Sequence, residues 1–337
     1  MRKLKMILPR DLKHLYRTIR AAMFLFIFSS YDLYRFFRSS SAFRVRKTIA
    51  QADALITMQY HTIEKGLALK QPRPGFGIVV VERLADALHD RIVKKLEWTS
   101  ACSNGLSALI AYQKFNDDSG VERNQSIERT IEAAQDRNIE AKEDATKIVH
   151  RQDILDCTNF DAEEFFWSRH SVRQFESGGL DMQRFLEALD LGRSAPSVCN
   201  RQTARVRYVI NQGGNLGFLE LQNGNRGFGS TAQAILIITS ELSNFVDPAE
   251  RYQGWIDGGM FAMTTLLGLH AKGFGACCLN WSQTHTADLE LRKRLKLPPT
   301  ETVIMLIAVG NMPNEFPVAQ SSRLPANDII VRVEPTH

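Results

Sequence analysis

The first segment of the chain, residues 1–47, repeats apolar positions with the period of an α-helix. Five apolar residues recur there at steps of three and four: Leu12, Leu15, Ile19, Met23 and Phe26. The unbroken apolar run covers only 21–28, whereas a helix that crosses a bilayer needs roughly 20 apolar residues. The pattern therefore predicts an amphipathic arm rather than a membrane span.

The second segment, 48–150, has helical periodicity throughout. One apolar stripe consists of Ile49, Ile56, Tyr60, Ile63 and Leu67. A Pro- and Gly-rich break at 72–77 follows, and further helices are predicted over 79–97, 104–115 and 124–149. The last is highly charged with a thin apolar stripe, which is typical of a solvated connector. We expect a helical N-terminal domain over 48–150.

The pattern changes to mixed helices and strands in the third segment, 151–337. The stretches ARVRYVI, AQAILIITS and ETVIMLIAVG are rich in β-branched residues and read as strands. Amphipathic or apolar helices are predicted from DMQRFLEALDLGRSA and from WIDGGMFAMTTLLGLHAKGFG, the latter ending at Gly273 or Gly275. This arrangement indicates an α+β sandwich over 151–337.

Composition and charge narrow the function classes. The 337 residues are 44% apolar and 23% charged, as in ordinary globular proteins. Residues 1–47 hold twelve Lys or Arg and two acids, a charge of +10, so the rest of the chain carries −5. The basic charge thus belongs to the arm, which argues against a nucleic-acid-binding protein. The arm suits either an anionic membrane surface or packing on protein.

Cysteine and histidine spacing gives no metal or disulfide pattern. The five cysteines include no CxxC pair, and the eight histidines show no paired ligand spacing. We therefore expect a cytoplasmic protein without a metal site, peripheral at the inner face of the membrane if the arm binds lipid.

Two polar motifs in the third segment are candidates for ligand binding. The sequence S-R-H-S-V-R at 168–173 places two arginines and a hydroxyl where they could grip a phosphate, although such clusters are commonly solvated surface. The sequence A-P-S-V-C-N-R-Q at 195–202 offers amide donors and acceptors to a heterocycle, or is an ordinary loop that ends a helix.

In this order, followed by G-F-G at 273–275 and S-R-L-P at 322–325, the motifs resemble the nitroreductase superfamily over Phe160 to Val333. The resemblance implies an α+β sandwich, a homodimer, and FMN at the subunit interface. It implies that FMN is bound by Arg169, His170, Ser171, Arg173, Pro196, Ser197, Asn200, Gln202, Ala276, Cys277, Cys278, Leu279 and Arg323. The first four and Arg323 would hold the phosphate and ribityl chain, and the others would lie along the ring.

The chain departs from the family pattern at three places. Gln202 is followed by Thr203-Ala204 rather than Pro-Trp, Arg201 adds a charge, and His170 often has Arg in its place. These departures bear on the identity of the substrate more than on flavin binding.

A further motif, Y-H-T-I-E-K-G-L at 60–67, lies in the helical domain. With R-P-G-F-G at 73–77, it resembles a segment found ahead of nitroreductase domains in bacterial proteins linked to surface-polysaccharide gene clusters. His61, Glu64 and Lys65 share a helix face, which suits either acid–base catalysis by His61 or a structural ion-pair network.

The resemblance predicts an FMN-dependent oxidoreductase that takes electrons from NADH or NADPH and reduces a small organic acceptor. Two alternatives stay open: a flavoenzyme that modifies a sugar or lipid-linked intermediate, and a flavin-binding scaffold without catalysis. The physiological substrate and the preference between the two nicotinamides are not determined by the sequence.

Overall fold

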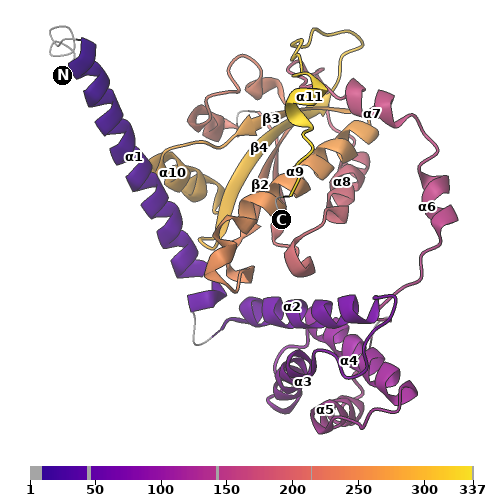
Figure 1. The fold of residues 1–337 in the computed structure, drawn as a ribbon. Helices are drawn as coiled ribbons and strands as arrows, with labels where there is room; N and C mark the ends of the chain where they lie inside the picture. Colours follow the sequence, from indigo (N-terminus) through magenta and orange to yellow (C-terminus); the bar gives the residue numbers. More distant parts are fainter. Residues whose placement is uncertain (1–9, 44–46, 142–143, 214, 336–337) are drawn as a thin grey trace.

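The structure is a computed structural model that describes residues 10–43, 47–141, 144–213 and 215–335 (Figure 1). The N-terminal part has the helices α1 (Arg10–Ser39), α2 (Ile49–Leu67), α3 (Ile78–Val93), α4 (Ser100–Asp118) and α5 (Gln125–Gln135). The C-terminal part has the helices α6 (Arg151–Cys157), α7 (Ala162–Ser168), α8 (Met182–Leu191), α9 (Gln253–Ala271), α10 (His285–Leu295) and α11 (Ala326–Ile329). Its strands are β1 (Ala204–Ile210), β2 (Ala234–Glu241), β3 (Phe274–Asn280) and β4 (Glu301–Asn311).

The C-terminal part is built on an antiparallel sheet of strand order β1-β2-β4-β3. Successive residues of the central strands point to opposite faces, so Leu236 packs against α8 and α9, whereas Ile235 and Ile237 pack toward α10 and the loops beside it. Figure 1 shows α8 and α9 together on one face of the sheet. The predicted α+β sandwich is therefore confirmed.

The N-terminal helices α2 to α5 enclose a core of their own, which includes Ile56, Leu84, Leu88 and Leu109. The predicted helical segment is thus present, but some of its boundaries differ. The helix predicted over 79–97 ends at Val93, and the one predicted over 104–115 begins at Ser100 because Thr99 caps it.

The helix predicted over 124–149 is wrong in its second half. The helix α5 ends at Gln135, because Asn138 adopts a left-handed conformation with φ of 53°. The amide of Ile139 donates to the carbonyl oxygen of Ala134 at 2.9 Å, and Ile139 packs against the helical core. This is a Schellman-type helix end, so the connector continues without helix through the described residues up to His150.

The strand β3 was not expected from the sequence. Gly273, with φ of 72°, ends α9 as predicted, but the residues after it continue as a strand that pairs with β4. Its sequence FGACCLN is poor in β-branched residues, and the pairing with β4 decides its conformation. The residues Ala276 to Leu279 therefore lie on an edge strand of the sheet rather than in a glycine loop.

The helices α8 and α9 cross closely at Gly268. A Cβ atom at Gly268 in α9 would overlap the carbonyl oxygen of Ala188 in α8 and would lie 3.1 Å from Leu191 Cβ. We expect Gly268→Ala to lower the free energy of unfolding by about 1–3 kcal/mol, since backbone atoms must separate. Gly259, on the same helix, has nothing within 4 Å of its Cβ position. Gly259→Ala should instead add about 0.5–1 kcal/mol from helix propensity. Urea denaturation measures both, and equal effects would contradict the close crossing.

The basic arm forms one long helix, α1, as its apolar period predicted. Residues 1–9 and 44–46 of the arm lie outside the described residues. Among the described helices, none combines the length and the apolarity that crossing a bilayer requires.

Candidate functional site

The first candidate cluster lies where α7 passes into a loop beside β3. The amide of Val172 donates to the carbonyl oxygen of Ala276 at 3.0 Å, and Ser171 forms a parallel bridge with the same residue. The hydroxyl of Ser168 lies 3.0 Å from Nε2 of His270, near the end of α9. The structure therefore brings the 168–173 motif to Ala276 in β3; the role of these residues in binding FMN stays a prediction.

The charge of this cluster is not neutralised within the described part of the chain. No carboxylate there forms an ion pair with Arg169, His170 or Arg173. Burial raises the pKa of the Cys277 thiol, and the nearby charges of Arg173 and Arg169 act in the opposite direction. Arg169 is half-buried and Arg173 is exposed. An arginine pair without an acid partner is suited to bind an anionic group such as a phosphate.

The pKa of His270 is lowered by burial, and the charges of Arg169 and His170 act in the same direction. The lowered pKa favours the neutral imidazole at neutral pH. Arg169 and Arg173 thus supply positive charge over the beginning of β3.

The second candidate cluster is a tightly wound loop at the other end of α9. The residues Cys199, Asn200 and Gln202 all have positive φ, between 49° and 52°, which is rare outside glycine. The hydroxyl of Ser197 accepts a hydrogen bond from the Gln202 amide at 2.9 Å. Pro196, Asn200 and Gln202 are exposed, so the strained backbone presents the two amide side chains outward.

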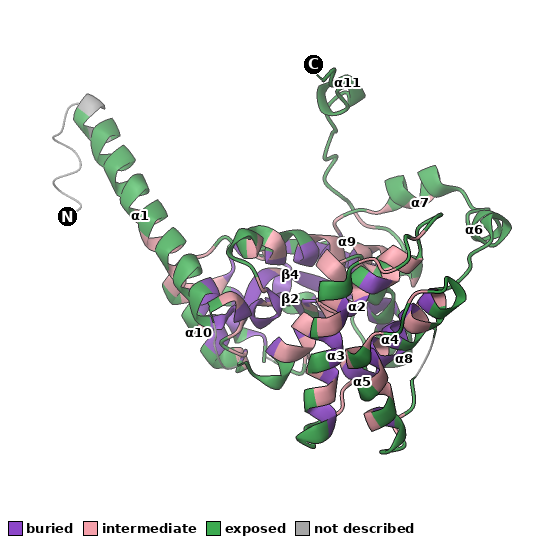
Figure 2. Cartoon of the chain, turned by 60° about the horizontal axis from the view of Figure 1, so that its bottom comes forward, coloured by how far each residue is buried: buried purple, intermediate pink, exposed green. Residues whose placement is uncertain are grey.

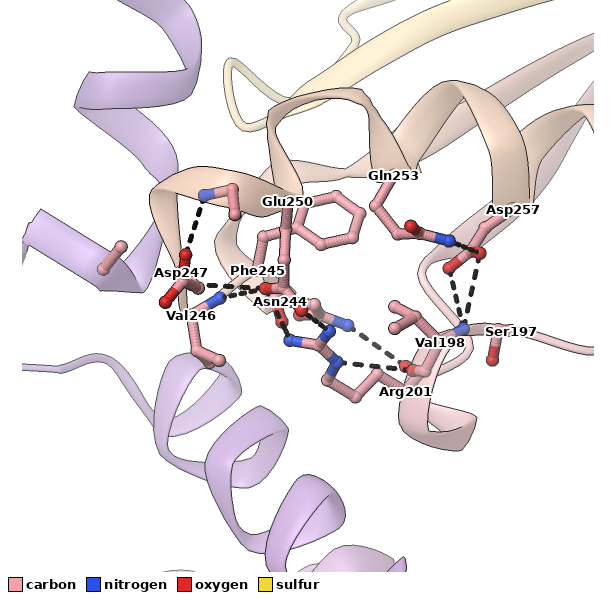
Figure 3. Close-up of polar contacts among 12 residues, drawn as sticks. Ser197, Val198, Arg201, Asn244, Phe245, Val246, Asp247, Glu250, Gln253 and Asp257 are labelled. Atoms are coloured by element: carbon pink, nitrogen blue, oxygen red, sulfur yellow. Dashed lines mark hydrogen bonds and ion pairs between the residues drawn. The ribbon is translucent and has the colours of Figure 1, made fainter. Parts of the chain in front are cut away.

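Two buried charged groups hold this loop (Figure 3). Both carboxylate oxygens of Asp257, which is 1% exposed, accept from the Val198 amide, at 3.3 and 3.2 Å. The guanidinium of Arg201 is fully buried; it pairs with both carboxylate oxygens of Glu250 and donates to the carbonyl oxygen of Asn244 at 3.0 Å. Burial acts to raise the pKa of Glu250, but hydrogen bonds from Arg201 and from the amides of the 246–247 backbone lower it below its ordinary value.

Arg201 is therefore not an added charge that faces a ligand, as the departure from the family pattern suggested. It fixes the loop from the inside. Asp257 and Glu250 were missed by the sequence analysis. Glu250 belongs to a D-P-A-E capping box at 247–250, which marks a helix start but no partner for Arg201. The signal for Asp257 was that WIDGG places an acid inside an otherwise apolar helix.

The two clusters lie at opposite corners of the sheet. Ala276 shares a row of paired residues with Ile210, the last residue of β1, whereas the second cluster immediately precedes the first residue, Ala204. Six residues along a strand span about 20 Å, and three strand spacings add about 14 Å across the sheet, which gives a diagonal of roughly 25 Å. Within one chain, the backbones of the two clusters are therefore roughly 25 Å apart.

The remaining predicted residue, Arg323, lies in the C-terminal tail after β4. Its side chain is exposed and donates to the carbonyl oxygen of Ser321. Figure 2 shows this tail leaving the body of the fold before α11. Within the described chain, the structure thus does not bring Arg323 to the arginine pair beside β3.

The helical motif forms a local pair on α2. His61 Nδ1 lies 3.0 Å from Glu64 Oε2 on the next turn of α2, and Lys65 is exposed. The helix α2 contacts the 3₁₀ turn Val198–Asn200. The geometry fits the ion-pair interpretation of the motif; a catalytic role of His61 stays a prediction.

A cavity of 460 Å³ lies beside the end of β3, between α1 and the sheet. Asn280 and Trp281, which directly follow Leu279, line it together with Tyr31 of α1 and Trp255 of α9. The aromatic lining is typical of a site for a small organic molecule.

Residues 209–311 match the model of the nitroreductase family. The matched range contains β2, α9, β3 and β4, and thus Ala276–Leu279. The two polar motifs at 168–173 and 195–202 lie before it, and Arg323 lies after it. No curated protein matches the chain significantly.

Several solved structures are similar to the C-terminal half. A candidate nitroreductase from Desulfovibrio desulfuricans, solved in complex with FMN, is 19% identical, with 53% of this chain and 99% of that chain covered and a TM-score of 0.45. A nitroreductase family protein from Clostridium difficile is 17% identical, with 51% and 98% covered and a TM-score of 0.43. One from Streptococcus pneumoniae is 20% identical, with 50% and 98% covered and a TM-score of 0.43.

Proposed function

Because residues 209–311 form a nitroreductase-family domain, we propose that this protein is an FMN-dependent oxidoreductase that uses NADH or NADPH to reduce a small organic acceptor. The observation that carries the proposal is the arginine pair, Arg169 and Arg173, which lies beside β3 without an acid partner among the described residues. A site with this charge suits the phosphate of a mononucleotide.

The residues present fit FMN. Arg169, Arg173 and the hydroxyl of Ser171 would hold the phosphate and ribityl chain, with His170 alongside. The segment Ala276–Leu279 would lie along the ring. When bound, FMN supplies two-electron chemistry, accepting hydride from the nicotinamide and passing electrons on to the acceptor.

The second cluster would complete the site from another copy of the chain. Pro196, Ser197, Asn200 and Gln202 would face the ring, where amide donors stabilise the negative charge of reduced flavin. Since one chain holds the two clusters roughly 25 Å apart, a flavin that contacts both requires a homodimer. Exposed apolar side chains on α9 support this association: Trp255, Ile256 and Met263 are 42%, 53% and 42% exposed.

The acceptor would bind in the 460 Å³ cavity that follows Leu279. Its aromatic walls, Trp255 and Trp281, would stack on a planar organic molecule and exclude water from it. The link to surface-polysaccharide synthesis stays a prediction from the sequence and is no part of this proposal.

An absorption spectrum tests the proposal most directly. We expect the purified protein, or the protein after incubation with FMN, to show the visible bands of oxidised flavin and to lose them when NADH or NADPH is added without oxygen. Dithionite serves as the control reductant. A protein that takes up no FMN would overturn the site. Flavin that dithionite bleaches and neither nicotinamide reduces would overturn the proposed electron donor.

A further inference from the structure

The C-terminal half of helix α1 is attached to the C-terminal domain by one face. The hydroxyl of Tyr31 donates to Asp288 Oδ2 at 2.7 Å. The buried guanidinium of Arg35 donates to Thr302 Oγ1 at 3.2 Å and to nearby carbonyl oxygens. Phe36 is 5% exposed, and its ring stacks on that of Phe245 at 6.2 Å. These contacts fix the orientation of the whole helix relative to the domain.

A different face of α1 is an exposed apolar stripe. It consists of Leu12, Leu15, Tyr16, Ile19, Met23, Phe26, Leu33, Tyr34 and Phe37. Their exposed fractions lie between 49% and 74%. At about 100° per residue, these side chains fall within a sector of about 100° that is turned away from Tyr31 and Arg35, and the stripe is roughly 38 Å long. Figure 2 shows the N-terminal half of α1 standing clear of the domain with its residues exposed.

The apolar surface continues beyond the helix. The rings of Phe37 and Phe43 lie 4.9 Å apart. With Phe36, Pro248 and Ala249 they line a shallow hollow of 640 Å³ at the end of the stripe. An exposed apolar surface of this length marks a binding site rather than ordinary surface.

The charge of the arm identifies the partner. Arg20 is exposed beside the stripe, and its guanidinium lies over the ring of Phe24 at 5.3 Å. Segment 1–47 carries +10 in total, with only Asp11 and Asp32 as acids. If the stripe paired with a second copy of itself, the two basic arms would repel each other, because the sequence offers them no matching acids. An anionic lipid surface complements both the apolar and the basic face.

We propose that α1 lies in the plane of an anionic lipid bilayer, with the apolar stripe among the acyl chains and the basic side chains at the headgroups. The catalytic domain would then sit on the side of α1 away from the bilayer. This inference rests on α1 alone, so it holds or fails independently of the flavin chemistry.

Sedimentation of the full chain with vesicles tests the proposal. We expect binding to vesicles of equal parts phosphatidylglycerol and phosphatidylcholine, weaker binding to phosphatidylcholine alone, and release by salt. The triple variant I19S/M23S/F26S should lose at least about 100-fold in affinity, because three apolar side chains that would enter the acyl region are replaced by polar ones. Arg20→Gln should lose about fivefold on the anionic vesicles, since about 1 kcal/mol per basic residue is removed.

The matched control is Leu25→Ser. Leu25 is 68% exposed on the same helix but lies off the stripe, so its replacement should leave vesicle binding within about twofold of the unchanged protein if it stays outside the acyl chains. The mass of each variant in solution gives the second measurement. If the triple variant keeps its vesicle binding, the stripe is not the lipid contact and the membrane proposal is wrong. If the unchanged protein binds no vesicles and the triple variant changes its oligomeric mass, the stripe contacts protein and the proposal is also wrong.

Discussion

Replacing Arg201 by methionine is expected to lower the free energy of unfolding by about 3–5 kcal/mol, because Glu250 loses the ion pair that compensates its burial. The guanidinium is fully buried and the Glu250 side chain is 18% exposed. The variant also leaves the carbonyl oxygen of Asn244 without its donor. Chemical denaturation of the two proteins at neutral pH measures the difference.

An exposed ion pair provides the matched control. Arg193 and Asp190 form a pair at 2.7 Å in which both side chains are mostly exposed. Arg193→Met should therefore change stability by no more than about 1 kcal/mol. A similar small loss for Arg201→Met would contradict the view that the buried pair holds the loop.

The pH dependence gives an independent check of the same pair. The pKa of Glu250 is lowered in the folded protein by its hydrogen bonds with Arg201 and two backbone amides, against the effect of burial. Because the pKa of Glu250 is lower in the folded protein, the ionised carboxylate stabilises the fold at pH values above the ordinary glutamate pKa of about 4.3. This stabilisation is lost as the pH falls through the lower pKa of the folded protein. The difference between Arg201→Met and the unchanged protein should therefore shrink on acidification below about pH 4.

The parts of the fold predicted correctly from the sequence are those in which local pattern and tertiary packing agree. The strand β4 is apolar without interruption from Val303 to Val309 because both of its faces are covered, so its composition alone indicates a buried strand. The long helix α9 is likewise apolar around most of its circumference and ends at a glycine with positive φ.

The errors occur where a few contacts override the local pattern. Gly273 and Gly275 predict a turn at the start of β3. Pairing with β4 instead holds the residues from Phe274 onward in an extended conformation. At Asn138, one left-handed residue ends α5 inside a sequence whose helical period continues. Neither outcome is visible without the neighbouring elements.

The candidate site shows the same limit. The two polar motifs can be recognised in the sequence, and the structure joins the first of them to Ala276 by a backbone bridge. The sequence does not indicate which residues of a motif face outward. Arg201 lies between the exposed Asn200 and Gln202, yet its side chain is buried, because Glu250 from a later turn compensates its charge.

Removing both arginines of the first cluster is expected to weaken FMN binding by at least about 100-fold, since each charge-assisted hydrogen bond contributes about 1.5–3 kcal/mol. The variant is Arg169→Ala with Arg173→Ala. Both side chains lie outside the packed core, and neither pairs with an acid among the described residues, so the fold should be retained. Fluorescence titration with FMN measures the affinity, and circular dichroism checks the fold. An unchanged affinity would exclude the cluster as the phosphate site.

Mixed dimers then decide whether one flavin is bound by two chains. The second variant replaces Asn200 and Gln202 by glycine, which accepts the positive φ at both positions while removing the amide side chains. Each variant alone should bind little FMN. In a dimer with one chain of each kind, one of the two sites combines the intact first cluster of one chain with the intact second cluster of the other.

We therefore expect mixed dimers, purified through a different tag on each chain, to bind one FMN per dimer, against two for the unchanged protein. The reason is geometric: clusters roughly 25 Å apart in one chain can contact the same flavin only from two chains. If each flavin were bound within a single chain, every chain of the mixed dimer would carry a defect and none would recover binding. Mixed dimers without FMN would thus disprove the shared site and leave the arginine pair as a site within one chain.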